Sequence, residues 1–290
     1  MLKFCTLFSG SSGNCAFIGT DRAKLLVDAG VTAKSIEHEL GLIGEDPGEV
    51  DAILITHEHI DHIRGAGVLA RRYGIKIIAN DRTWRAMDQE IGKTEPEQRI
   101  VIDASSGSFY VGGLEVSSFT IPHDAADPVG YTVSDRRHRV TVATDTGFLS
   151  PSLFEHFKGS DAVLIEANHD LDMLENGPYP RYLIARIRGN RGHLSNVSCG
   201  ELASKLALGG TRAIILGHLS KENNLPEVAY ETVRRTMEES GVVIVDHTDV
   251  IPPDFFAPGS VTSEQAGGQY PAEAGLVVAP RYGHSKVILI

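Results

Sequence analysis

Short apolar runs rich in β-branched residues recur along the whole chain, and each has the length of one strand. Helical patterns lie between several of them, over 32–40, 63–73, 81–91, 196–208 and 226–240. Hairpin-like strand pairs in the first half, together with strand and helix alternation, predict an α/β (α+β) fold with mixed sheets and outer helices. The runs are KLLVDAG, AILIT, KIIAN, RIVID, LEVSSFTIP, VGYTVS, RVTVATDTG, AVLIEAN, AIILGH and VVIVDH.

The helical pattern over 196–208 carries clear end signals. Ser195 is a plausible N-cap, Leu202 and Leu206 share one face, and Gly209 follows as a C-cap. The sequence therefore predicts a helix with these boundaries.

The composition limits the partners that this chain can have. A length of 290 residues with 42% hydrophobic content can fill a sizeable core. The formal net charge of −11 provides no global positive field that would attract nucleic acid or anionic lipid. A polyanionic substrate must therefore be met by a local patch or by a metal ion.

Cysteine usage and hydropathy favour a cytoplasmic protein without a membrane partner. The three cysteines, Cys5, Cys15 and Cys199, show no CxxC spacing, which fits a reducing compartment. No apolar run approaches the roughly 20 residues of a membrane span, and the N-terminus turns polar too soon for a signal peptide. Residues 252–275, with their Pro, Gly and Ala content, are typical of an extended surface tail.

The stretch ILITHEHIDHIRG places three histidines and an aspartate directly after a buried-type strand that ends at Thr56. Imidazole nitrogen and carboxylate oxygen suit Zn, Mn or Fe, and no thiolate is present to favour a closed structural zinc site. The HExxH protease pattern is not met, because an aspartate stands where its second histidine belongs. A polar surface loop with chance histidines is the alternative, which the fixed spacing disfavours. The candidate ligands are His57, His59, Asp61 and His62.

Further candidate ligands stand at the ends of later strands. His123 follows SSFTIP, Asp145 follows RVTVAT, and His218 follows AIILG. Each alone would be an ordinary strand-end residue. Four ligands from one loop cannot surround two ions, so together these residues are expected to complete a site with two divalent ions.

This pattern resembles the metallo-β-lactamase superfamily, whose fold is a four-layer αββα sandwich with a metal site at one edge of the two sheets. The resemblance covers residues 1–250, with 251–290 as a C-terminal extension packed on the same domain or trailing from it. It implies that Asp145 bridges both ions and that Asp28 supports the metal loop as a neighbour of the ligands. It further implies His57, His59 and His123 at the first ion, and Asp61, His62 and His218 at the second.

The chemistry within that superfamily follows from the ligand set. A set with Asp61 and Asp145 but no cysteine resembles the phosphodiesterases and nucleases. Two ions about 4 Å apart can activate a bridging hydroxide, here held by Asp61 and Asp145, and neutralise a phosphodiester. Only 73 positions separate Asp145 from His218, too few for a large inserted domain. The substrate groove is then built from loops of one domain, or completed by a partner subunit in a homodimer.

Several other stretches resemble the YycJ/WalJ branch of the superfamily. They include LFSGSSGN, IPHDAADPVGY, EANHD, YPRYLIARIRGNRGHLSN and GHLSKENN. The resemblance implies a DNA exonuclease acting on single-stranded or nicked DNA. The alternatives are a small-molecule hydrolase of a cyclic phosphodiester or thioester, an RNA-processing nuclease, and a non-catalytic metal-binding protein.

The proton donor and the substrate contacts are less constrained. His193 resembles a histidine that is thought to protonate the leaving oxygen in RNA-processing members, and His169 competes for this role. Arg191 belongs to an arginine-rich stretch that could meet a phosphate. Ser220 and Asn223 could contact the substrate or cap the helix that follows.

Two other features favour structural roles. The segment FSGSSGN, residues 8–14, is expected to form a hairpin turn whose amides could face the substrate. Trp84 lies in a helical pattern and is expected in the core.

Overall fold

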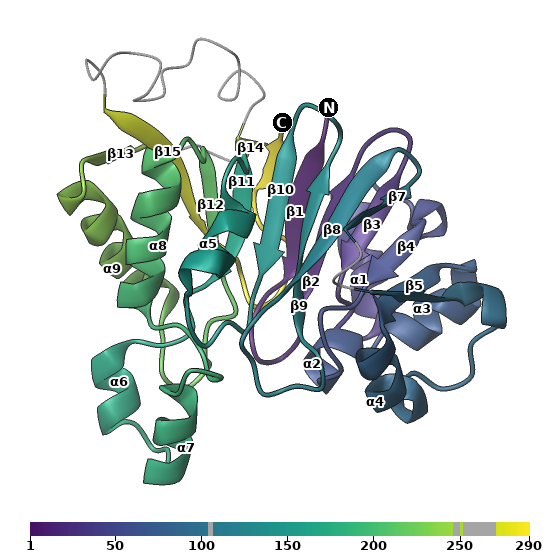
Figure 1. Cartoon of the computed structure of the whole chain (residues 1–290), viewed down its shortest axis with the longest axis horizontal. Coiled ribbons are helices and arrows are strands. Elements are labelled where there is room, and N and C mark those ends of the chain that lie inside the picture. The colour runs from purple at the N-terminus through teal and green to yellow at the C-terminus, as the bar shows by residue number, and fades with distance from the viewer. Residues whose placement is uncertain (104–106, 246–249, 252–270) are drawn as a thin grey trace.

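Two mixed β-sheets pack face to face, and helices cover both outer surfaces (Figure 1). The computed structural model describes residues 1–103, 107–245, 250–251 and 271–290. Within these residues the first sheet has the order β14-β16-β1-β2-β3-β4-β5-β6. Its strands are β14 (Val250–Ile251), β16 (Val287–Leu289), β1 (Lys3–Phe8), β2 (Cys15–Gly19), β3 (Lys24–Val27), β4 (Ala52–Leu54), β5 (Lys76–Asn80) and β6 (Arg99–Ile102).

The second sheet has the order β13-β15-β12-β11-β10-β9-β8-β7. Strands β10, β11 and β12 are parallel neighbours, whereas β7 to β10 form an antiparallel meander. The strands are β13 (Val242–Ile244), β15 (Ala272–Val278), β12 (Ala213–Gly217), β11 (Ala162–Glu166), β10 (Arg139–Ala143), β9 (Val129–Ser134), β8 (Leu114–Thr120) and β7 (Ser108–Val111).

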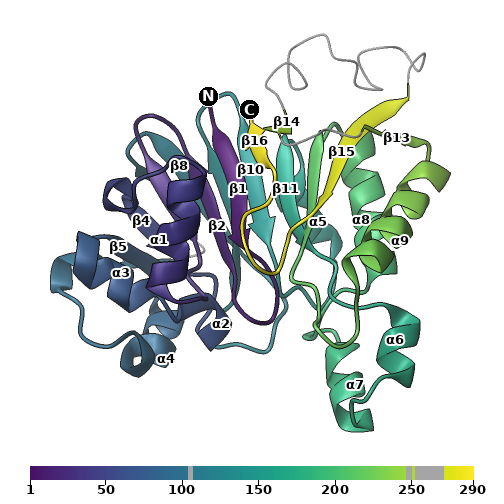
Figure 2. The same ribbon diagram turned by 180° about the vertical axis from the view of Figure 1, so that it is seen from behind.

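The helices divide between the two outer faces (Figure 2). Helices α1 (Ala33–Leu42), α3 (Ala66–Tyr73) and α4 (Asp81–Ile91) pack on the first sheet. Helices α5 (Pro151–Phe157), α8 (Asn196–Leu208) and α9 (Pro226–Glu239) pack on the second. The short helices α2 (Ile60–Ile63), α6 (Leu171–Asn176) and α7 (Arg181–Ile187) lie at the lower edge of the sheets in Figure 1.

Alternation along the strands produces three apolar layers. Leu25 and Val27 of β3 face the core between the sheets, whereas Leu26 faces the helices. A strand buried on both faces must be apolar at every position, which explains why these runs show no polar alternation. The expected αββα sandwich is confirmed by this layer order.

Most local expectations are confirmed. Ser195 caps α8 by accepting a hydrogen bond from the Ser198 amide, and Gly209 is the C-cap. Trp84 is buried, and its indole donates to the Ile100 carbonyl. Strands β1 and β2 form the expected hairpin around 9–14. The helix expected over 63–73 begins later, at Ala66, because Arg64 and Gly65 link it to α2.

The C-terminal residues complete both sheets. Strand β15 lies between β12 and β13, and β16 pairs with β1. The surface tail expected over 252–275 falls largely outside the described residues. For 272–275 it is wrong, since Ala272 and Ala274 are buried in β15. Among the described residues, no helix is long and apolar enough to span a membrane.

The topology brings the candidate ligands to one edge. The parallel pair β3 and β4 and the parallel set β10, β11 and β12 end on the same side of the sandwich. The loops that leave these strands, together with the loop after β8, meet at the lower edge in Figure 1. Polar side chains far apart in sequence therefore come together there.

Candidate metal centre

The loop after β4 is fixed by a buried carboxylate. The Thr56 amide donates to Asp28 Oδ1 and its hydroxyl donates to Asp28 Oδ2, both at 2.8 Å. Because the Thr56 hydroxyl donates its proton to Asp28, Thr56 Oγ1 accepts a hydrogen bond from His57 Nδ1 at 3.0 Å. His62 Nδ1 likewise donates to Asp28 Oδ2 at 2.7 Å. These bonds leave Nε2 of both histidines directed away from Asp28.

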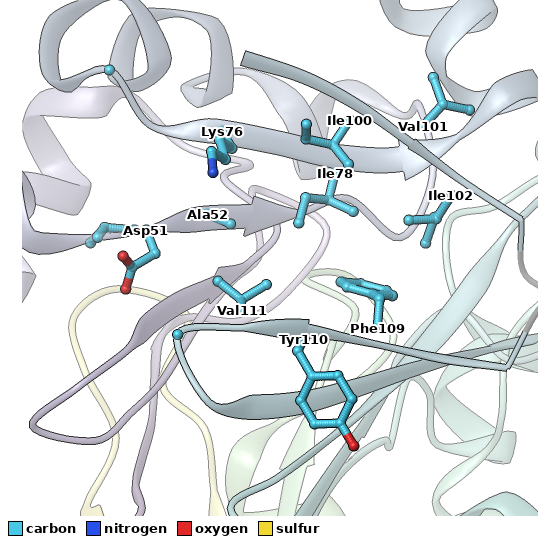
Figure 3. A pocket seen from close by; sticks show the side chains of 13 residues that line it. Asp51, Ala52, Lys76, Ile78, Ile100, Val101, Ile102, Phe109, Tyr110 and Val111 are labelled. Carbon is cyan, nitrogen blue, oxygen red and sulfur yellow. The ribbon is translucent and has the colours of Figure 1, made fainter. Parts of the chain in front are cut away.

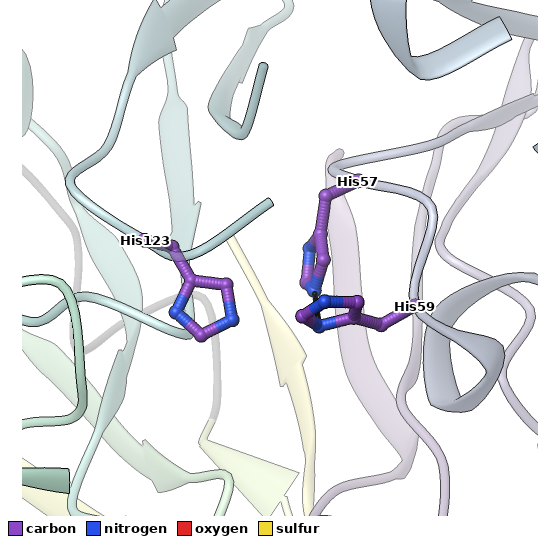
Figure 4. Close-up of side chains that lie close together, drawn as sticks. All are labelled: His57, His59 and His123. Atoms are coloured by element: carbon purple, nitrogen blue, oxygen red, sulfur yellow. Dashed lines mark hydrogen bonds between the residues drawn. The ribbon is translucent and has the colours of Figure 1, made fainter. Parts of the chain in front are cut away.

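Four overlapping groups of possible ligand residues form at this edge; two of them match the expected ligand sets, and the other two both include Asp145. The first comprises His57, His59 and His123, whose rings turn toward one another in Figure 4. Nε2 of His57 lies 3.1 Å from Nδ1 of His59. The second comprises Asp61, His62 and His218. Within each group the possible ligand atoms lie within 4.8 Å of one another.

Asp145 lies between the two groups. Its Oδ2 is 3.2 Å from His62 Nε2 and 3.2 Å from His218 Nδ1, and its Oδ1 is 3.8 Å from His123 Nε2. One carboxylate thus faces both groups, which is the arrangement that a bridging ligand requires.

Backbone strain concentrates at the same residues. Among the described non-glycine residues, four have a positive φ, and three of these are Asp28 (62°), Asp145 (58°) and His218 (52°). A left-handed conformation is unfavourable for residues with a Cβ and persists only where the surroundings enforce it. All three follow a strand end, so the strained residue turns its side chain into the site.

The donor set fits a divalent metal. Two buried ring nitrogens, His123 Nδ1 and His218 Nδ1, have no hydrogen-bond partner. Burial, and then the charge of His62, hold the pKa of His57 well below its ordinary value, so its imidazole is neutral. Burial opposes ionisation of Asp145, but the neighbouring histidines outweigh it and keep its pKa well below the usual range. The neutral His57 imidazole and the ionised Asp145 carboxylate are the forms that bind metals. Burial lowers the pKa of His62, but the carboxylates of Asp28 and Asp145 outweigh it and raise this pKa, so a metal ion bound at His62 would displace its proton.

A carboxylate that the sequence did not single out holds His193. Glu166, fully buried at the end of β11, accepts from His193 Nδ1 at 2.7 Å and from the Thr146 amide at 2.9 Å. Burial lowers the pKa of His193, but the charge and hydrogen bond of Glu166 outweigh it and raise this pKa to about 9. The sequence signal that could have identified Glu166 is a charged residue at the end of the apolar run AVLIE. His193 itself lies against the site, with its ring centroid 5.2 Å from that of His123 and 5.4 Å from that of His218.

The hairpin loop over 9–14 supports the second ligand group. Ser9 Oγ accepts from the His218 amide at 2.9 Å, and the Asn14 amide donates to the Asp61 carbonyl at 2.8 Å. The Asn14 side-chain amide nitrogen lies 3.1 Å from His62 Nε2. Ser9 and Asn14 are therefore positioning residues that the sequence alone did not reveal.

Arg191 and His169, the other predicted site residues, differ in their positions relative to the ligand groups. Arg191 donates from Nε to the His123 carbonyl at 3.2 Å, which anchors the loop after β8. His169 is buried, and burial lowers its pKa to about 4; its backbone carbonyl accepts from the Asn196 amide. His193, and not His169, lies beside the ligand groups.

Ser220 and Asn223 do not cap the following helix, because α9 has Leu225 as its N-cap and Pro226 in its first turn. That alternative is wrong. Ser220 lines a small cavity beside the site. Asn223 is fully buried and a Cβ on Gly177 would meet its Oδ1, which does not favour a direct substrate contact.

Two cavities differ in their relation to the site. A cavity of about 180 Å³ is lined by His193, His218 and residues of α7. A larger one, of about 640 Å³, opens between the edge strands β6 and β7, where Ile100, Phe109 and Val111 line it (Figure 3). The larger cavity includes none of the candidate ligands, so the chemistry belongs to the smaller one.

Comparisons with known proteins show the family of this chain. The family model of the beta-lactamase superfamily domain matches residues 23–219. Exodeoxyribonuclease YycJ of Bacillus anthracis is 39% identical over 240 residues, which cover 83% of this chain and 90% of that protein. Exodeoxyribonuclease WalJ of Streptococcus pneumoniae serotype 2 (strain D39) is 42% identical over 233 residues, which cover 80% of this chain and 86% of that protein.

A solved structure supports the fold independently. The metallo-beta-lactamase fold protein YhfI of Bacillus subtilis superposes with a TM-score of 0.68 over 98% of both chains, at 14% sequence identity. The chain therefore belongs to the beta-lactamase superfamily and, within it, to the family of the YycJ and WalJ proteins.

Proposed function

We propose that this protein is a metal-dependent exodeoxyribonuclease that hydrolyses the phosphodiester bonds of single-stranded or nicked DNA. The observation that carries the proposal is Asp145, whose two oxygens face two separate groups of ligand atoms. The names of the relatives from Bacillus anthracis and Streptococcus pneumoniae supply the substrate class.

The ligands would divide between two divalent ions, Zn or Mn, with Fe as a third choice. His57, His59 and His123 would hold one ion, and Asp61, His62 and His218 the other, with Asp145 shared. Such a pair of ions supplies an activated water and neutralises charge on the phosphate. Asp61 and His59 are half-buried whereas the other proposed ligands are buried, so Asp61 is the carboxylate ligand that is open to substrate and water.

His193 would protonate the leaving oxygen. His193 Nδ1 donates a hydrogen bond to Glu166, so Nε2 is the nitrogen left to act on the substrate. The raised pKa keeps His193 protonated near neutral pH, and this is the form that a general acid needs. The ring lies between the substrate cavity and the ligand groups.

A cytoplasmic location fits this activity. The three cysteines are free and buried, as in proteins of reducing compartments. A DNA substrate is also found in that compartment.

The net charge of −11 favours a second candidate, hydrolysis of a small phosphodiester, since no global field attracts a polymer. One experiment separates the two. Metal-reconstituted protein is incubated with end-labelled DNA and RNA strands and with bis(p-nitrophenyl) phosphate. A nuclease shortens the DNA from one end, and its affinity falls steeply with salt.

The Asp145→Ala variant serves as the inactive control, and His38→Ala, on the exposed side of α1, as the matched active one. Hydrolysis of the small ester without any cleavage of DNA would contradict the nuclease assignment. Activity of Asp145→Ala equal to that of the unchanged protein would contradict the metal centre.

A further inference from the structure

The cavity of about 180 Å³ beside the ligand groups has two chemically different walls. On one wall stand His193 and His218, which belong to the candidate metal centre. On the other stand Tyr179, Leu183 and Ile187, from α7 and the turn before it. The ion pair of Arg186 and Asp124 also lines the cavity. A group that fills this cavity therefore has its reacting end at the metals and an apolar body against α7.

The apolar wall is incompletely covered by the protein. Tyr179, Leu183 and Ile187 are each half-buried, and all three line the cavity. Apolar and aromatic surfaces of this kind accept the flat face of a nucleobase, and such stacking does not depend on which base is present. Asn168 and Ser220 add polar groups to the lining, as a deoxyribose would require.

The size of the cavity limits what enters. Pockets for drug-sized ligands measure about 300–1,000 Å³. A volume of about 180 Å³ is smaller, so it suits a single base and not a stack of two.

Hydrogen bonds and close backbone packing connect α7 to the loops that carry His123 and His193. Arg186 of α7 donates from Nε to Asp124 Oδ2 at 2.6 Å, next to His123 in the loop after β8. A Cβ on Gly192 would lie 2.1 Å from the Ile187 carbonyl oxygen. The backbone just before His193 therefore packs closely against the end of α7. The distance from wall to metal centre is thus set by the fold.

We propose that this cavity binds the terminal nucleoside of the DNA strand, with its base against Tyr179, Leu183 and Ile187. Occupancy by a single nucleoside places the first phosphodiester bond at the metal centre. The cavity then selects strand ends and releases one nucleotide at a time. This inference rests on the proposed nuclease function and adds a base-binding site to it.

The test changes the substrate and the protein separately, by removing the terminal base and by substituting Leu183. Single-stranded oligonucleotides carry an abasic tetrahydrofuran residue at the 5′ end, at the 3′ end or at neither, and the rate of the first cleavage is measured. The unchanged protein should cleave about tenfold more slowly when the abasic residue is at the end it attacks, because stacking of one base is lost.

Leu183→Trp fills the cavity and should cleave the ordinary strand about tenfold more slowly, with little further loss for the abasic strand. Leu183→Ala removes apolar surface from the wall without adding bulk, so its cleavage rates on ordinary and abasic strands should also differ less than those of the unchanged protein. This second variant keeps the test valid if the larger tryptophan prevents folding. Leu171→Trp is the matched control, because Leu171 is exposed on α6 and does not line the cavity. The ratio of its cleavage rates on ordinary and abasic strands should equal that of the unchanged protein.

Equal rates of the unchanged protein on ordinary and abasic strands would overturn the base-binding site while leaving the nuclease function in place. Discrimination that persists in both Leu183 variants would overturn it as well. Absence of cleavage of any strand would instead overturn the nuclease function, and the inference with it.

Discussion

Glu166 Oε1 accepts a hydrogen bond from His193 Nδ1 at 2.7 Å, and the carboxylate is fully buried at the end of β11. A buried carboxylate without a partner would be costly, so this pair fixes both the position of the imidazole and its protonated form. The other oxygen, Oε2, accepts from the amides of Thr146 and Leu194. Glu166 thereby ties together the loops that carry Asp145 and His193.

A proton donor matters most when the leaving group is poor. His193→Ala should reduce cleavage of DNA by about 10²- to 10⁴-fold, the usual contribution of a positioned acid. Its effect on bis(p-nitrophenyl) phosphate should be much smaller, because p-nitrophenolate leaves without protonation. The measurement is kcat on both substrates. An equal loss on both would show that His193 supports the site in another way.

Removing the charge of Glu166 should act through the same imidazole. Glu166→Gln keeps the shape of the side chain, and we expect kcat on DNA to fall by about 10²-fold with a smaller change in KM. Glu201→Gln, on the exposed side of α8, is the matched control. A change confined to KM would argue against a role of Glu166 in proton transfer.

Metal ions should stabilise the folded chain, because the site gathers buried groups that lack partners. A free ion concentration one-hundredfold above Kd adds about 2.7 kcal/mol to the free energy of unfolding. Chelation should therefore lower Tm and abolish hydrolysis, and Zn or Mn should restore both. In Asp145→Ala the increase in Tm should shrink, whereas His38→Ala should respond normally. An unchanged Tm of the parent protein on chelation would speak against a bound metal.

The metal loop was readable from sequence because its residues are close together in the chain. His57, His59 and His62 stand within six positions after one strand, so local spacing alone predicts a shared site. Their roles as ligands stay a prediction. His123, Asp145 and His218 required one further step, because they share an edge only when β8, β10 and β12 run in the same direction in one sheet.

Other features depended on pairings that no local pattern encodes. Glu166 reads as an ordinary polar strand end until the fold brings it to His193, 27 residues away. Strand β15 follows a segment rich in Gly and Ala, and its place between β12 and β13 is decided by the assembled sheet. The cavity beside α7 likewise arises from contacts between segments distant in sequence, such as Arg186 and Asp124.

Asp28 offers a test of the support behind the metal ligands. It has φ of 62°, a conformation that asparagine tolerates well, so Asp28→Asn removes the charge with little cost to the backbone. The His62 and Thr56 hydrogen bonds should weaken, and metal affinity should fall by about 10- to 100-fold. Titration of activity with metal measures this, and excess metal should recover part of it. Asp21→Asn, on the exposed turn before β3, is the control. Unchanged metal affinity in Asp28→Asn would refute the supporting role.

Gly30 should be irreplaceable for a steric reason that is independent of charge. A Cβ at this position would lie 1.6 Å from the Asp61 carbonyl oxygen and 2.6 Å from the Asn14 amide nitrogen. Both are backbone atoms, so the metal loop or the hairpin loop must move. Gly30→Ala should therefore lower the free energy of unfolding by about 2–3 kcal/mol and weaken metal binding as well.

The control for Gly30→Ala is a glycine with free space. Gly41 lies in α1 with no atom within 4 Å of its added Cβ, and alanine favours a helix over glycine by about 0.5–1 kcal/mol. Gly41→Ala should thus leave stability equal or higher, as measured by urea unfolding of both variants. If Gly30→Ala unfolds at the same urea concentration as the parent and binds metal equally well, the loops around Asp61 can rearrange freely. The close packing of Gly30, Asn14 and Asp61 would then not be what positions the second group of ligands.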